Sequence, residues 1–433
     1  MRIVELNQGN VKNVLSDLLK RSPSQYGKYE ETVQEILKNV KENGDKAIFE
    51  YTKKFDRFDL TAENIRVTRA EIDKAYEQLD PKLIEVIKQA AENVRTFHQK
   101  QLRNSWFDAK PDGTIVGMKI TALETVGVYV PGGKAAYPSS VLMNVVPAKV
   151  AGVDRVVMTT PPGADGSVNP GTLVAADIAG VDEIYKVGGA QAIAALAYGT
   201  ESIPKADKIT GPGNIFVALA KKAVYGYVSI DSIAGPSEIL VLADETANPR
   251  YVAADLLSQA EHDELASAIL ITTSTELAEK VSKEVDGFVA VLERKEIIQK
   301  SLDNFGYILV AKDMQEAINA VNAIASEHLE ILTKNPFEIM TKIRNAGAIF
   351  LGEYASEPLG DYFAGPNHIL PTNGTAKFFS PVNVDDFIKK TSIISYSRDA
   401  LKKVNEEIQL FAKSEGLTAH ANSIRVRFEK DEV

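Results

Sequence analysis

The chain has 433 residues, 45% of them hydrophobic and 25% charged, so it is long enough for two or three domains with a sizeable core. Its formal net charge is −10 and its pI is near 5.3, and the 49 Lys and Arg residues are not concentrated in one stretch. This excludes nucleic acids and anionic membranes as expected partners and favours a small-molecule ligand. No apolar run approaches a membrane span and no secretory signal is recognised, so we expect a cytoplasmic protein.

The first hundred or so residues are charged and mostly helical in pattern, with apolar residues at helical spacing in Glu31–Tyr51 and Leu79–Leu102. From residue 125, short β-branched strands alternate with Ala-rich helices, which is typical of a parallel sheet. The strands expected in this α/β unit are Val126–Val130, Arg155–Thr159, Ile184–Val187 and Lys208–Thr210.

A second α/β unit is predicted to begin near Ser237. Its expected strands are Ile239–Leu242, Ala268–Thr272, Tyr307–Val310, Leu329–Leu332 and Ala348–Leu351. After Pro381 the pattern indicates a short extended segment, a helix at Ser397–Ser414 and a polar tail. This C-terminal segment has too little apolar surface for its own core, so we expect it to dock onto another part of the protein.

The chain has no cysteine, so the candidate catalytic and metal-binding residues must be of other types. This excludes disulfides and thiolate zinc ligands, and it removes the commonest nucleophile for oxidising an aldehyde. Four of the five histidines, at positions 98, 262, 328, 368 and 420, lie in the second half of the chain. That half therefore holds the candidate metal and catalytic residues.

Gln259 and His262 are three residues apart on an expected helix, where both side chains would face the same way and could chelate a cation. A solvated or capping histidine is the alternative. Glu327 and His328 lie at a helix-to-strand junction and could supply two distinct bases. A surface glutamate beside a packed histidine would give the same pattern.

Two further segments carry acidic and imidazole side chains. Gly360–Pro371 is predicted to be a tight loop around Asp361 and His368, because two glycines and two prolines restrict its backbone. A structural turn capped by Asp361 is the alternative. Glu415–His420 places another Glu and His on the C-terminal segment, where a solvated tail is the competing interpretation.

No G-x-G-x-x-G fingerprint occurs, so a dinucleotide site must be argued from other Gly-rich turns. Pro131–Lys134, Gly188–Gln191 and Gly211–Asn214 each follow an expected strand, at the end of the sheet where ligands of open α/β proteins bind. Their main-chain N–H groups could hold a pyrophosphate. Simple tight connections would have the same sequence.

From about Thr125 to His420, the chain resembles the histidinol dehydrogenase family in a series of long motifs that occur in the family's order. The motifs are Gly127–Ala148 (GVYVPGGKAAYPSSVLMNVVPA), Val187–Thr200 (VGGAQAIAALAYGT), Thr210–Val217 (TGPGNIFV), Ala234–Glu238 (AGPSE), SQAEHD, SEHL, GDYFAGPNHILPT and EGLTAH. The resemblance implies an enzyme that oxidises L-histidinol through L-histidinal to L-histidine with two NAD⁺, in histidine biosynthesis.

The resemblance also implies roles for individual residues. The implied zinc ligands, for one Zn²⁺ per subunit, are Gln259, His262, Asp361 and His420. Glu327 and His328 correspond to the family's bases, and the substrate site would add Ser237, His368 and Glu415 to His328 and the metal ligands. Tyr129, Gln191 and Asn214 match the positions that contact NAD. Since imidazole titrates near neutral pH, we expect His328 to take the alcohol proton and Glu327 to activate water.

The implied fold consists of two incomplete Rossmann-like parallel-sheet domains, with a helical N-terminal region and a C-terminal arm exchanged in a homodimer. Residues 24–128 plus 237–380 would form the first domain, 129–236 the NAD-side domain, and 1–23 and 381–433 the terminal arms. Glu415 and His420 would then serve the partner subunit's site.

Three alternatives remain open at this stage. The substrate could be another polar alcohol, because Ser237, His368 and Glu415 only suggest recognition of an imidazole and an amino group. The His, Asp and Glu set would also suit a zinc-dependent hydrolase, which would act without NAD. A non-catalytic ligand-binding protein would show no turnover. Zinc and manganese are both compatible with the ligand types.

Overall fold

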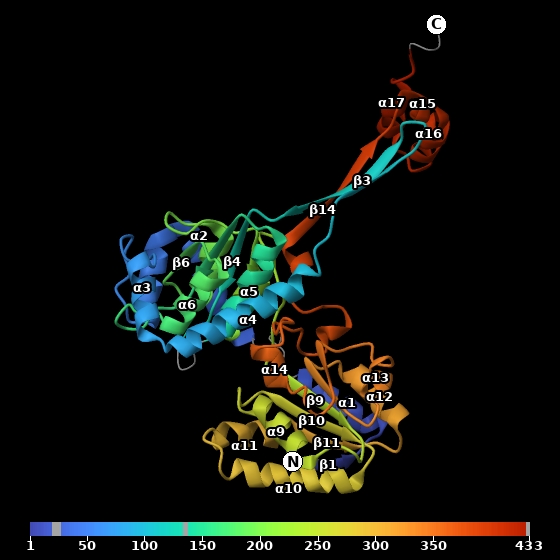
Figure 1. Cartoon of the computed structure of the whole chain (residues 1–433). Helices are drawn as coiled ribbons and strands as arrows, with labels where there is room; N and C mark the ends of the chain where they lie inside the picture. The colour runs from blue at the N-terminus through green and yellow to red at the C-terminus, as the bar shows by residue number, and fades with distance from the viewer. Residues whose placement is uncertain (20–26, 133–136, 430–433) are drawn as a thin grey trace. The chain divides into compact units, whose positions relative to one another are not determined.

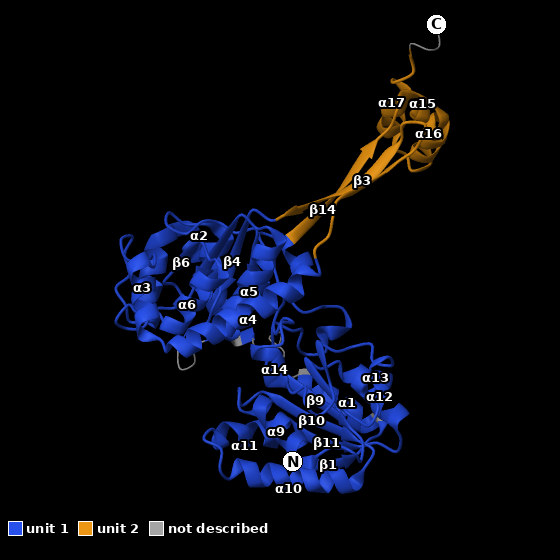
Figure 2. Cartoon of the chain, viewed as in Figure 1, with its two compact units in different colours: residues 1–101, 123–387 blue, residues 102–122, 388–433 orange. Residues whose placement is uncertain are grey.

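The computed structural model describes residues 1–19, 27–132 and 137–429, and the chain forms two compact units (Figures 1 and 2). Unit 1 comprises Met1–Gln101 and Leu123–Phe387, and unit 2 comprises Leu102–Ala122 and Ile388–Val433. Within the described ranges, none of the helices combines the length and hydrophobicity needed to span a membrane. The cytoplasmic localisation stays a prediction.

The first sheet of unit 1 has six parallel strands in the order β1-β11-β10-β9-β12-β13. Their bounds are β1 Arg2–Glu5, β9 Glu238–Ala243, β10 Ser267–Thr272, β11 Gly306–Val310, β12 His328–Leu332 and β13 Ala348–Leu351. The strands predicted for the second α/β unit are confirmed. β1 was not predicted, and it pairs with β11 at the sheet edge, so the start of the chain is part of this sheet rather than a separate arm at residues 1–23.

Helices cover both faces of the six-stranded sheet. They are α1 Gln8–Leu19, α9 Pro249–Ala260, α10 Thr275–Val289, α11 Lys295–Phe305, α12 Met314–Ile324, α13 Pro336–Met340 and α14 Glu357–Tyr362. Alternate residues of β9 enter different cores: Leu240 and Leu242 pack with α1 and α12, whereas Ile239 and Val241 pack with α9 and α10. Burial of each such side chain contributes about 1.5–3 kcal/mol, so strands covered on both faces are almost entirely apolar.

The second sheet of unit 1 has five parallel strands in the order β6-β5-β4-β7-β8. Its strands are β4 Thr125–Tyr129, β5 Arg155–Thr159, β6 Glu183–Tyr185, β7 Lys208–Thr210 and β8 Ser229–Ile230. The helices between them are α5 Pro138–Ala151, α6 Pro170–Ala179, α7 Gly189–Tyr198 and α8 Ile215–Val224. The strands predicted for this unit are confirmed, while residues 133 and 134 of the expected turn Pro131–Lys134 lie outside the described residues.

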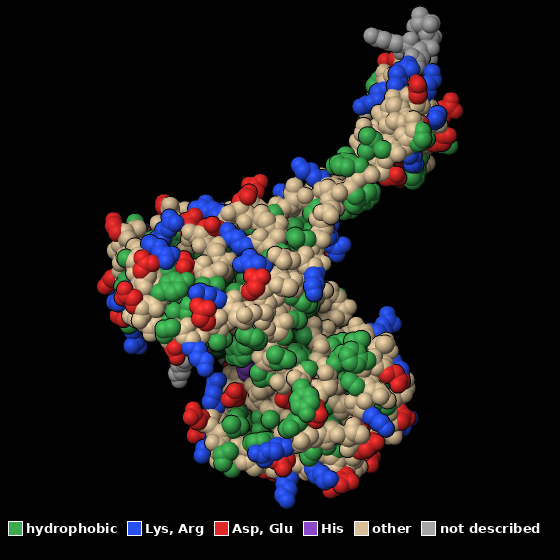
Figure 3. Space-filling model, in the orientation of Figure 1, with side chains coloured by type: hydrophobic (Ala, Val, Ile, Leu, Met, Phe, Trp, Pro, Cys, Tyr) green, Lys and Arg blue, Asp and Glu red, His purple; other side chains and the backbone are tan. Residues whose placement is uncertain are grey.

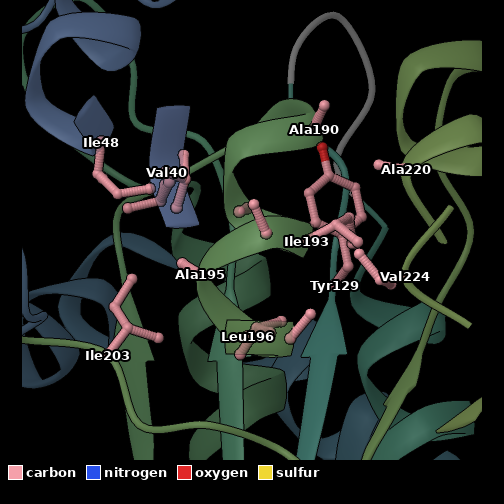
Figure 4. Close-up of a cluster of buried hydrophobic side chains, with 14 of the residues drawn as sticks. Val40, Ile48, Tyr129, Ala190, Ile193, Ala195, Leu196, Ile203, Ala220 and Val224 are labelled. Carbon is pink, nitrogen blue, oxygen red and sulfur yellow. The ribbon is translucent and has the colours of Figure 1, made fainter. Parts of the chain in front are cut away.

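The N-terminal helices belong with the five-stranded sheet. They are α2 Gly27–Phe55, α3 Arg69–Gln78 and α4 Pro81–Gln99. α2 contacts α7 and α8, α3 contacts α6, and α4 contacts α5 and α6. Val40 and Ile48 of α2 share a buried cluster with Ile193 and Leu196 of the Ala-rich helix α7 (Figure 4). This packing differs from the expected grouping of residues 24–128 with 237–380.

Unit 2 contains an antiparallel sheet in the order β14-β3-β2, followed by three helices (Figure 2). The elements are β2 Trp106–Ala109, β3 Ile115–Ala122, β14 Ile388–Ser395, α15 Arg398–Lys403, α16 Asn405–Ser414 and α17 Thr418–Arg425. The extended segment expected after Pro381 is therefore a strand paired with β3, and the single helix predicted at Ser397–Ser414 is two helices that meet at Val404. On the face shown in Figure 3, acidic and basic side chains are interspersed.

Candidate active site

The charged residues of the candidate site gather at the edge of the six-stranded sheet where β9 and β12 begin. Glu238 is the first residue of β9 and His328 is the first residue of β12, and these strands are parallel neighbours. Glu327 immediately precedes β12, at the helix-to-strand junction that the sequence predicts. All three side chains are buried. The site thus lies at the amino ends of the strands, whereas ligands of open parallel sheets usually bind at the carboxyl ends.

Glu327 and Glu238 are linked by reciprocal hydrogen bonds between main chain and side chain. The Glu238 N–H donates to Glu327 Oε2 at 2.8 Å, and the Glu327 N–H donates to Glu238 Oε2 at 3.3 Å. Burial raises the pKa of Glu327 to about 8, with the His328 charge opposing this shift and the Glu238 charge adding to it. A carboxyl group with a pKa in this range can exchange a proton near physiological pH.

One ring nitrogen of His328 forms a hydrogen bond, and the other has no hydrogen-bond partner among the described residues. Nδ1 lies 3.0 Å from the main-chain oxygen of Glu238 and must carry the hydrogen, because a carbonyl only accepts. Nε2 is buried, has no hydrogen-bond partner among the described residues, and lies 3.8 Å from Asp361 Oδ1. Burial lowers the pKa of His328, but the charges of Glu327, Asp361 and Glu357 outweigh it and raise the pKa to about 10.

This pKa differs from the sequence-based hypothesis, which takes His328 as a base that titrates near neutral pH. The reason is the number of carboxylates around a single imidazole, which the sequence does not reveal. The charges of Glu327, Asp361 and Glu357 thus shift the pKa of this imidazole in the opposite direction from burial.

Asp361 lies on the short helix α14, so the predicted loop Gly360–Pro371 begins inside a helix. His368 Nδ1 donates to the main-chain oxygen of Asp361 at 3.0 Å and lies 3.7 Å from its Oδ1. Burial raises the pKa of Asp361, but the nearby imidazoles of His328 and His368 outweigh it and lower the pKa. Burial lowers the pKa of His368 itself. The structure therefore brings Asp361, His328 and His368 together.

Gln259 and His262 lie at the C-terminal end of α9. The helix ends at Ala260, so His262 lies just beyond it, and the single helix predicted through both residues is shorter than expected. The His262 N–H donates to the Gln259 main-chain oxygen at 3.1 Å, which keeps them in one turn. Gln259 Oε1 is buried without a hydrogen-bond partner in the described part of the chain. The His262 ring stays exposed, yet partial desolvation by surrounding protein lowers its pKa and favours neutral imidazole.

A second group of carboxylates adjoins Asp361. It was not predicted from the sequence. The Glu357 N–H donates to Glu330 Oε1 at 2.8 Å, and Ser258 Oγ donates to Glu357 Oε2 at 3.0 Å. Burial raises the pKa of Glu357 to about 7 and that of Asp255 to about 6, and it raises the pKa of Glu330 as well. Glu330 is a charged residue inside the otherwise apolar strand segment LEIL. This feature of the sequence could have indicated a buried carboxylate in the site.

His328, Glu357 and Asp361 each offer a ligand atom, and these atoms all lie within 4.8 Å of one another. A cluster of two carboxylates and an imidazole is suited to a divalent cation. Of these three residues, the sequence singled out only Asp361 as a metal ligand.

Ser237 lies directly before β9, and its main-chain oxygen accepts a hydrogen bond from the Ser267 N–H at 3.0 Å. Two residues earlier, the Gly235 N–H donates to Thr372 Oγ1 at 2.7 Å. This bond ties the AGPSE segment to the chain that follows His368. The structure thus places Ser237 beside the amino edge of the six-stranded sheet.

The residues expected to contact NAD lie at the carboxyl ends of the five-stranded sheet. Tyr129 ends β4 and is buried, and its hydroxyl accepts a hydrogen bond from the Gly189 N–H at the start of α7 at 3.2 Å (Figure 4). Gln191 is buried in the first turn of the same helix. Asn214 is exposed and caps α8, accepting from the Phe216 and Val217 N–H groups at 3.0 and 3.3 Å.

A buried ion pair anchors the turn before Asn214. Lys221 pairs with Asp231, and its Nζ donates to the Gly211 oxygen at 2.9 Å, while the Gly211 N–H donates to Asp231 Oδ2 at 2.8 Å. Gly211 has φ 120°, and a Cβ there would collide with the main-chain oxygen of Tyr129. The turn is therefore fixed against the end of β4, a detail that the sequence did not show.

The remaining residues of interest lie elsewhere. In unit 2, Glu415 follows α16 and His420 lies on α17, which occupies part of the expected polar tail, and both side chains are exposed. In unit 1, His98 is buried on α4 and donates from Nδ1 to the Val94 oxygen at 2.7 Å, so it has a structural role.

Comparison with known proteins decides the family. A family model described as histidinol dehydrogenase matches residues 19–428. The chain belongs to the histidinol dehydrogenase family. The histidinol dehydrogenase of Clostridium acetobutylicum is 57% identical over 429 residues, covering 99% of both chains. That of Halalkalibacterium halodurans is 60% identical over 399 residues, covering 92% of this chain and 94% of the relative.

A crystal structure of histidinol dehydrogenase from Elizabethkingia anophelis matches the whole fold, with a TM-score of 0.94 at 38% identity over 100% of this chain and 99% of that chain. This match confirms the α/β fold with parallel-sheet domains that the sequence predicts. Histidinol dehydrogenases are NAD-linked oxidoreductases. The carboxyl edge of the five-stranded sheet can therefore be compared with the needs of a dinucleotide, and the amino edge of the six-stranded sheet with those of the metal ion expected from the sequence.

The amino edge of the six-stranded sheet fits a zinc ion. Gln259 Oε1 is a buried acceptor without a partner in residues 1–19, 27–132 and 137–429, and the charge of Asp361 acts directly on His262. Gln259 and His262 also lie at the C-terminus of α9, where the helix dipole favours a cation. Nitrogen and oxygen ligands of this kind suit zinc.

The carboxyl edge of the five-stranded sheet fits a dinucleotide. α7 and α8 begin at this edge, and helix N-termini favour a pyrophosphate through their main-chain N–H groups and dipole. Tyr129, Gln191 and Asn214 come from three different segments that meet here. The residues present therefore agree with NAD at this sheet and a metal at the other.

Proposed function

We propose that this chain oxidises L-histidinol through L-histidinal to L-histidine with two NAD⁺, as the last steps of histidine biosynthesis, using one zinc ion per subunit. The observation that carries the proposal is the buried pair Glu327 and His328, held beside Asp361, whose charge acts on His262 just beyond α9. Two bases of different chemistry suit two successive oxidations, of an alcohol and of an aldehyde. Family membership supports the same assignment.

In the alcohol step, His328 takes the hydroxyl proton at Nε2. Its Nδ1 is committed to the Glu238 carbonyl, and the buried Nε2 has no partner within the described residues, so Nε2 is the nitrogen that remains for the substrate. A zinc ion held by the proposed ligands would orient the substrate and would oppose the carboxylate charges that raise the pKa of His328. Tyr129, Gln191 and Asn214 would hold NAD⁺, which would supply the hydride acceptor for each oxidation.

In the aldehyde step, Glu327 takes a proton from the water that adds to the carbonyl. A thiohemiacetal route is closed because the chain has no cysteine, so the aldehyde is oxidised as its hydrate. The Glu238 N–H holds Glu327 Oε2, which fixes the direction of the carboxylate. The raised pKa of Glu327 matches the requirement that it accept and release a proton at physiological pH.

The proposed zinc ligands are Gln259, His262, Asp361 and His420. The proposed substrate site comprises these four residues with Ser237, His328, His368 and Glu415. Residues 129–236 form the proposed NAD side.

We further propose a homodimer in which unit 2 of one subunit contributes Glu415 and His420 to its partner's site. Unit 2 exposes large apolar side chains that need a surface to cover them. These are Trp106, Phe107, Ile394, Leu410 and Phe411. Both Glu415 and His420 are also exposed, as residues that complete another subunit's site must be before assembly.

The primary test counts NADH at completion with limiting L-histidinol and excess NAD⁺, with and without a strong chelator. Two NADH per histidinol, lost on chelation, is the expected result. One NADH would show that the reaction stops at the aldehyde. No NADH would point to another alcohol or to NAD-independent hydrolysis.

Shared sites can be tested by mixing two inactive variants, His262→Asn and His420→Asn. In a hybrid dimer, one site would combine the intact His262 of one subunit with the intact His420 of the other. Co-expression is therefore expected to restore up to half of the activity in hybrid dimers, measured after separation by two affinity tags. Hybrids without activity would contradict the exchange.

A further inference from the structure

Glu238 contacts both proposed bases through its main chain, and its side chain has no role in the reaction proposed above. Its main-chain oxygen accepts from His328 Nδ1 at 3.0 Å, and its N–H donates to Glu327 Oε2 at 2.8 Å. Its side chain is 1% exposed, and Oε2 accepts from the Glu327 N–H at 3.3 Å. One residue therefore holds the ring of one base, the carboxylate of the other, and the main chain between the strands that carry them.

The second carboxylate oxygen of Glu238 extends this network. Oε1 accepts from the Asn373 N–H at 3.1 Å. The neighbouring Thr372 holds the Gly235 N–H through Oγ1 at 2.7 Å, so the segment before β9 is tied to the same loop. The Glu238 side chain thus joins the start of β9, the start of β12 and the loop that follows His368.

The chemistry of these bonds requires a carboxylate. Both side-chain oxygens face main-chain N–H donors, and a carboxylate is acceptor-only when ionised. An amide would direct its NH₂ group toward one of the two donors, so Glu238→Gln must break one bond and leave a buried N–H without its acceptor. The substitution keeps the volume of the side chain, so it changes the network without opening a cavity.

We propose that Glu238 is a positioning residue that holds Glu327 and His328 in the alignment required for proton transfer. This inference rests on the roles proposed for the two bases. Glu238 touches neither substrate nor cofactor in this scheme, and its effect on the reaction passes through Glu327 and His328. Its loss should therefore slow the chemical step and leave binding of zinc and NAD⁺ intact.

The test is a double-mutant cycle with Glu238→Gln, Glu327→Gln and the double variant, assayed with L-histidinal as substrate. Outer-shell partners of metal ligands typically contribute about 10–100-fold to activity, and by analogy Glu238→Gln alone is expected to lower kcat by that factor. KM for histidinal and bound zinc per subunit should stay close to wild type. In the Glu327→Gln background, the same change should lower kcat by less than about threefold, because the residue through which Glu238 acts is already disabled.

Ser267→Ala is the matched control. Ser267 is paired with Glu238 across β9 and β10, is equally buried, and its Oγ has no hydrogen-bond partner in the described part of the chain. This variant should keep kcat within about twofold of wild type. If Glu238→Gln fails to fold by circular dichroism, Glu238→Asp, which retracts the carboxylate by one methylene, is taken through the same cycle.

The outcomes separate this inference from the proposed function. Losses that multiply in the double variant, or a fully active Glu238→Gln enzyme, would overturn the positioning role while the dehydrogenase activity stands. A wild-type protein with no histidinol or histidinal oxidation would overturn the proposed function, and the role of Glu238 with it. Non-multiplying losses at unchanged zinc content would support the proposal.

Discussion

The two parallel sheets of unit 1 carry their candidate sites at opposite strand ends. On the six-stranded sheet, buried charged residues are the first residues of two strands: Glu238 begins β9 and His328 begins β12. On the five-stranded sheet, Tyr129 ends β4, and the Gly-rich turns at 188–191 and 211–214 follow β6 and β7. One edge offers carboxylates and imidazoles, and the other offers main-chain N–H groups.

This difference follows from the polarity of a strand-helix-strand unit. Each helix begins near the carboxyl end of one strand and ends near the amino end of the next, so its N-terminus and C-terminus lie at opposite edges of the sheet. The C-terminus of α9 therefore favours a cation at Gln259 and His262, and the N-termini of α7 and α8 favour a pyrophosphate. A single type of fold thus provides both a metal edge and a dinucleotide edge.

The largest effect is expected from His262→Asn at the amino edge. Loss of an imidazole ligand should abolish zinc retention, measured by elemental analysis after dialysis, and should remove both oxidation steps. Glu264→Gln is the control, because Glu264 is exposed, is not a proposed ligand, and pairs with Lys300 at 2.7 Å. A His262→Asn protein that is fully active without zinc would end the metal hypothesis.

At the same edge, Glu327→Gln is expected to lower kcat for histidinal by about 10²–10⁴-fold, the usual contribution of general acid–base catalysis. The conversion of histidinol to histidinal should fall much less, because His328 serves that step. Single-turnover assays with each substrate measure the two rates separately. Equal slowing of both would contradict the division of roles.

On the dinucleotide edge, Lys221→Met should raise KM for NAD⁺ on the order of tenfold with a small change in kcat. The substitution leaves the Asp231 carboxylate buried and unpaired, which typically costs about 3–5 kcal/mol of folding free energy. Steady-state kinetics and denaturant unfolding measure these effects. The adjacent Lys222→Met is the control, since Lys222 forms a partly exposed pair with Glu30 and should contribute below about 1 kcal/mol. Equal effects of the two lysines would disprove the anchoring role.

The smallest effect concerns Asp56, which follows α2 and whose charge acts on Tyr129. Burial raises its pKa from 3.8 to about 6. The folded protein therefore binds this proton more tightly than the unfolded chain, so ionised Asp56 costs stability as pH rises through this range. Asp56→Asn should gain on the order of 2 kcal/mol at pH 8 and nothing at pH 3, measured by denaturant unfolding.

Asp59→Asn is the control for that prediction, because Asp59 is exposed and pairs with Lys53 at 2.6 Å. Its substitution should change stability by less than about 1 kcal/mol. A wild-type protein and an Asp56→Asn variant with parallel pH profiles would show that Asp56 is not perturbed by burial.

The core strands were predictable because their pattern is local. Segments such as 239–242 and 268–272 are apolar and β-branched along their whole length, as strands buried on both faces must be. The helix-to-strand junction at Glu327 was equally visible. The helix that carries Gln259 was predicted correctly, but it ends at Ala260, before His262, because the spacing of residues along a helix does not fix its last turn.

Pairing between distant segments could not be predicted in the same way. β14 at 388–395 is polar and largely exposed, and it becomes a strand by pairing with β3 at 115–122. β1 has four residues and joins the six-stranded sheet only through β11. Such strands have weak patterns of their own, since the partner supplies the hydrogen bonds.

The order of apolar and polar residues along the chain predicted the α/β class and most of the strands. The motifs that carry Gln259, His262, Glu327 and Asp361 identified the family. The environment of these residues depends on tertiary structure. Only folding surrounds His328 with Glu327, Glu357 and Asp361, and this raises the pKa that the sequence placed near neutrality. Only folding makes Glu238 a partner of both bases. Side-chain identity is local, whereas burial, charge and hydrogen bonding come from residues that are far apart in the chain.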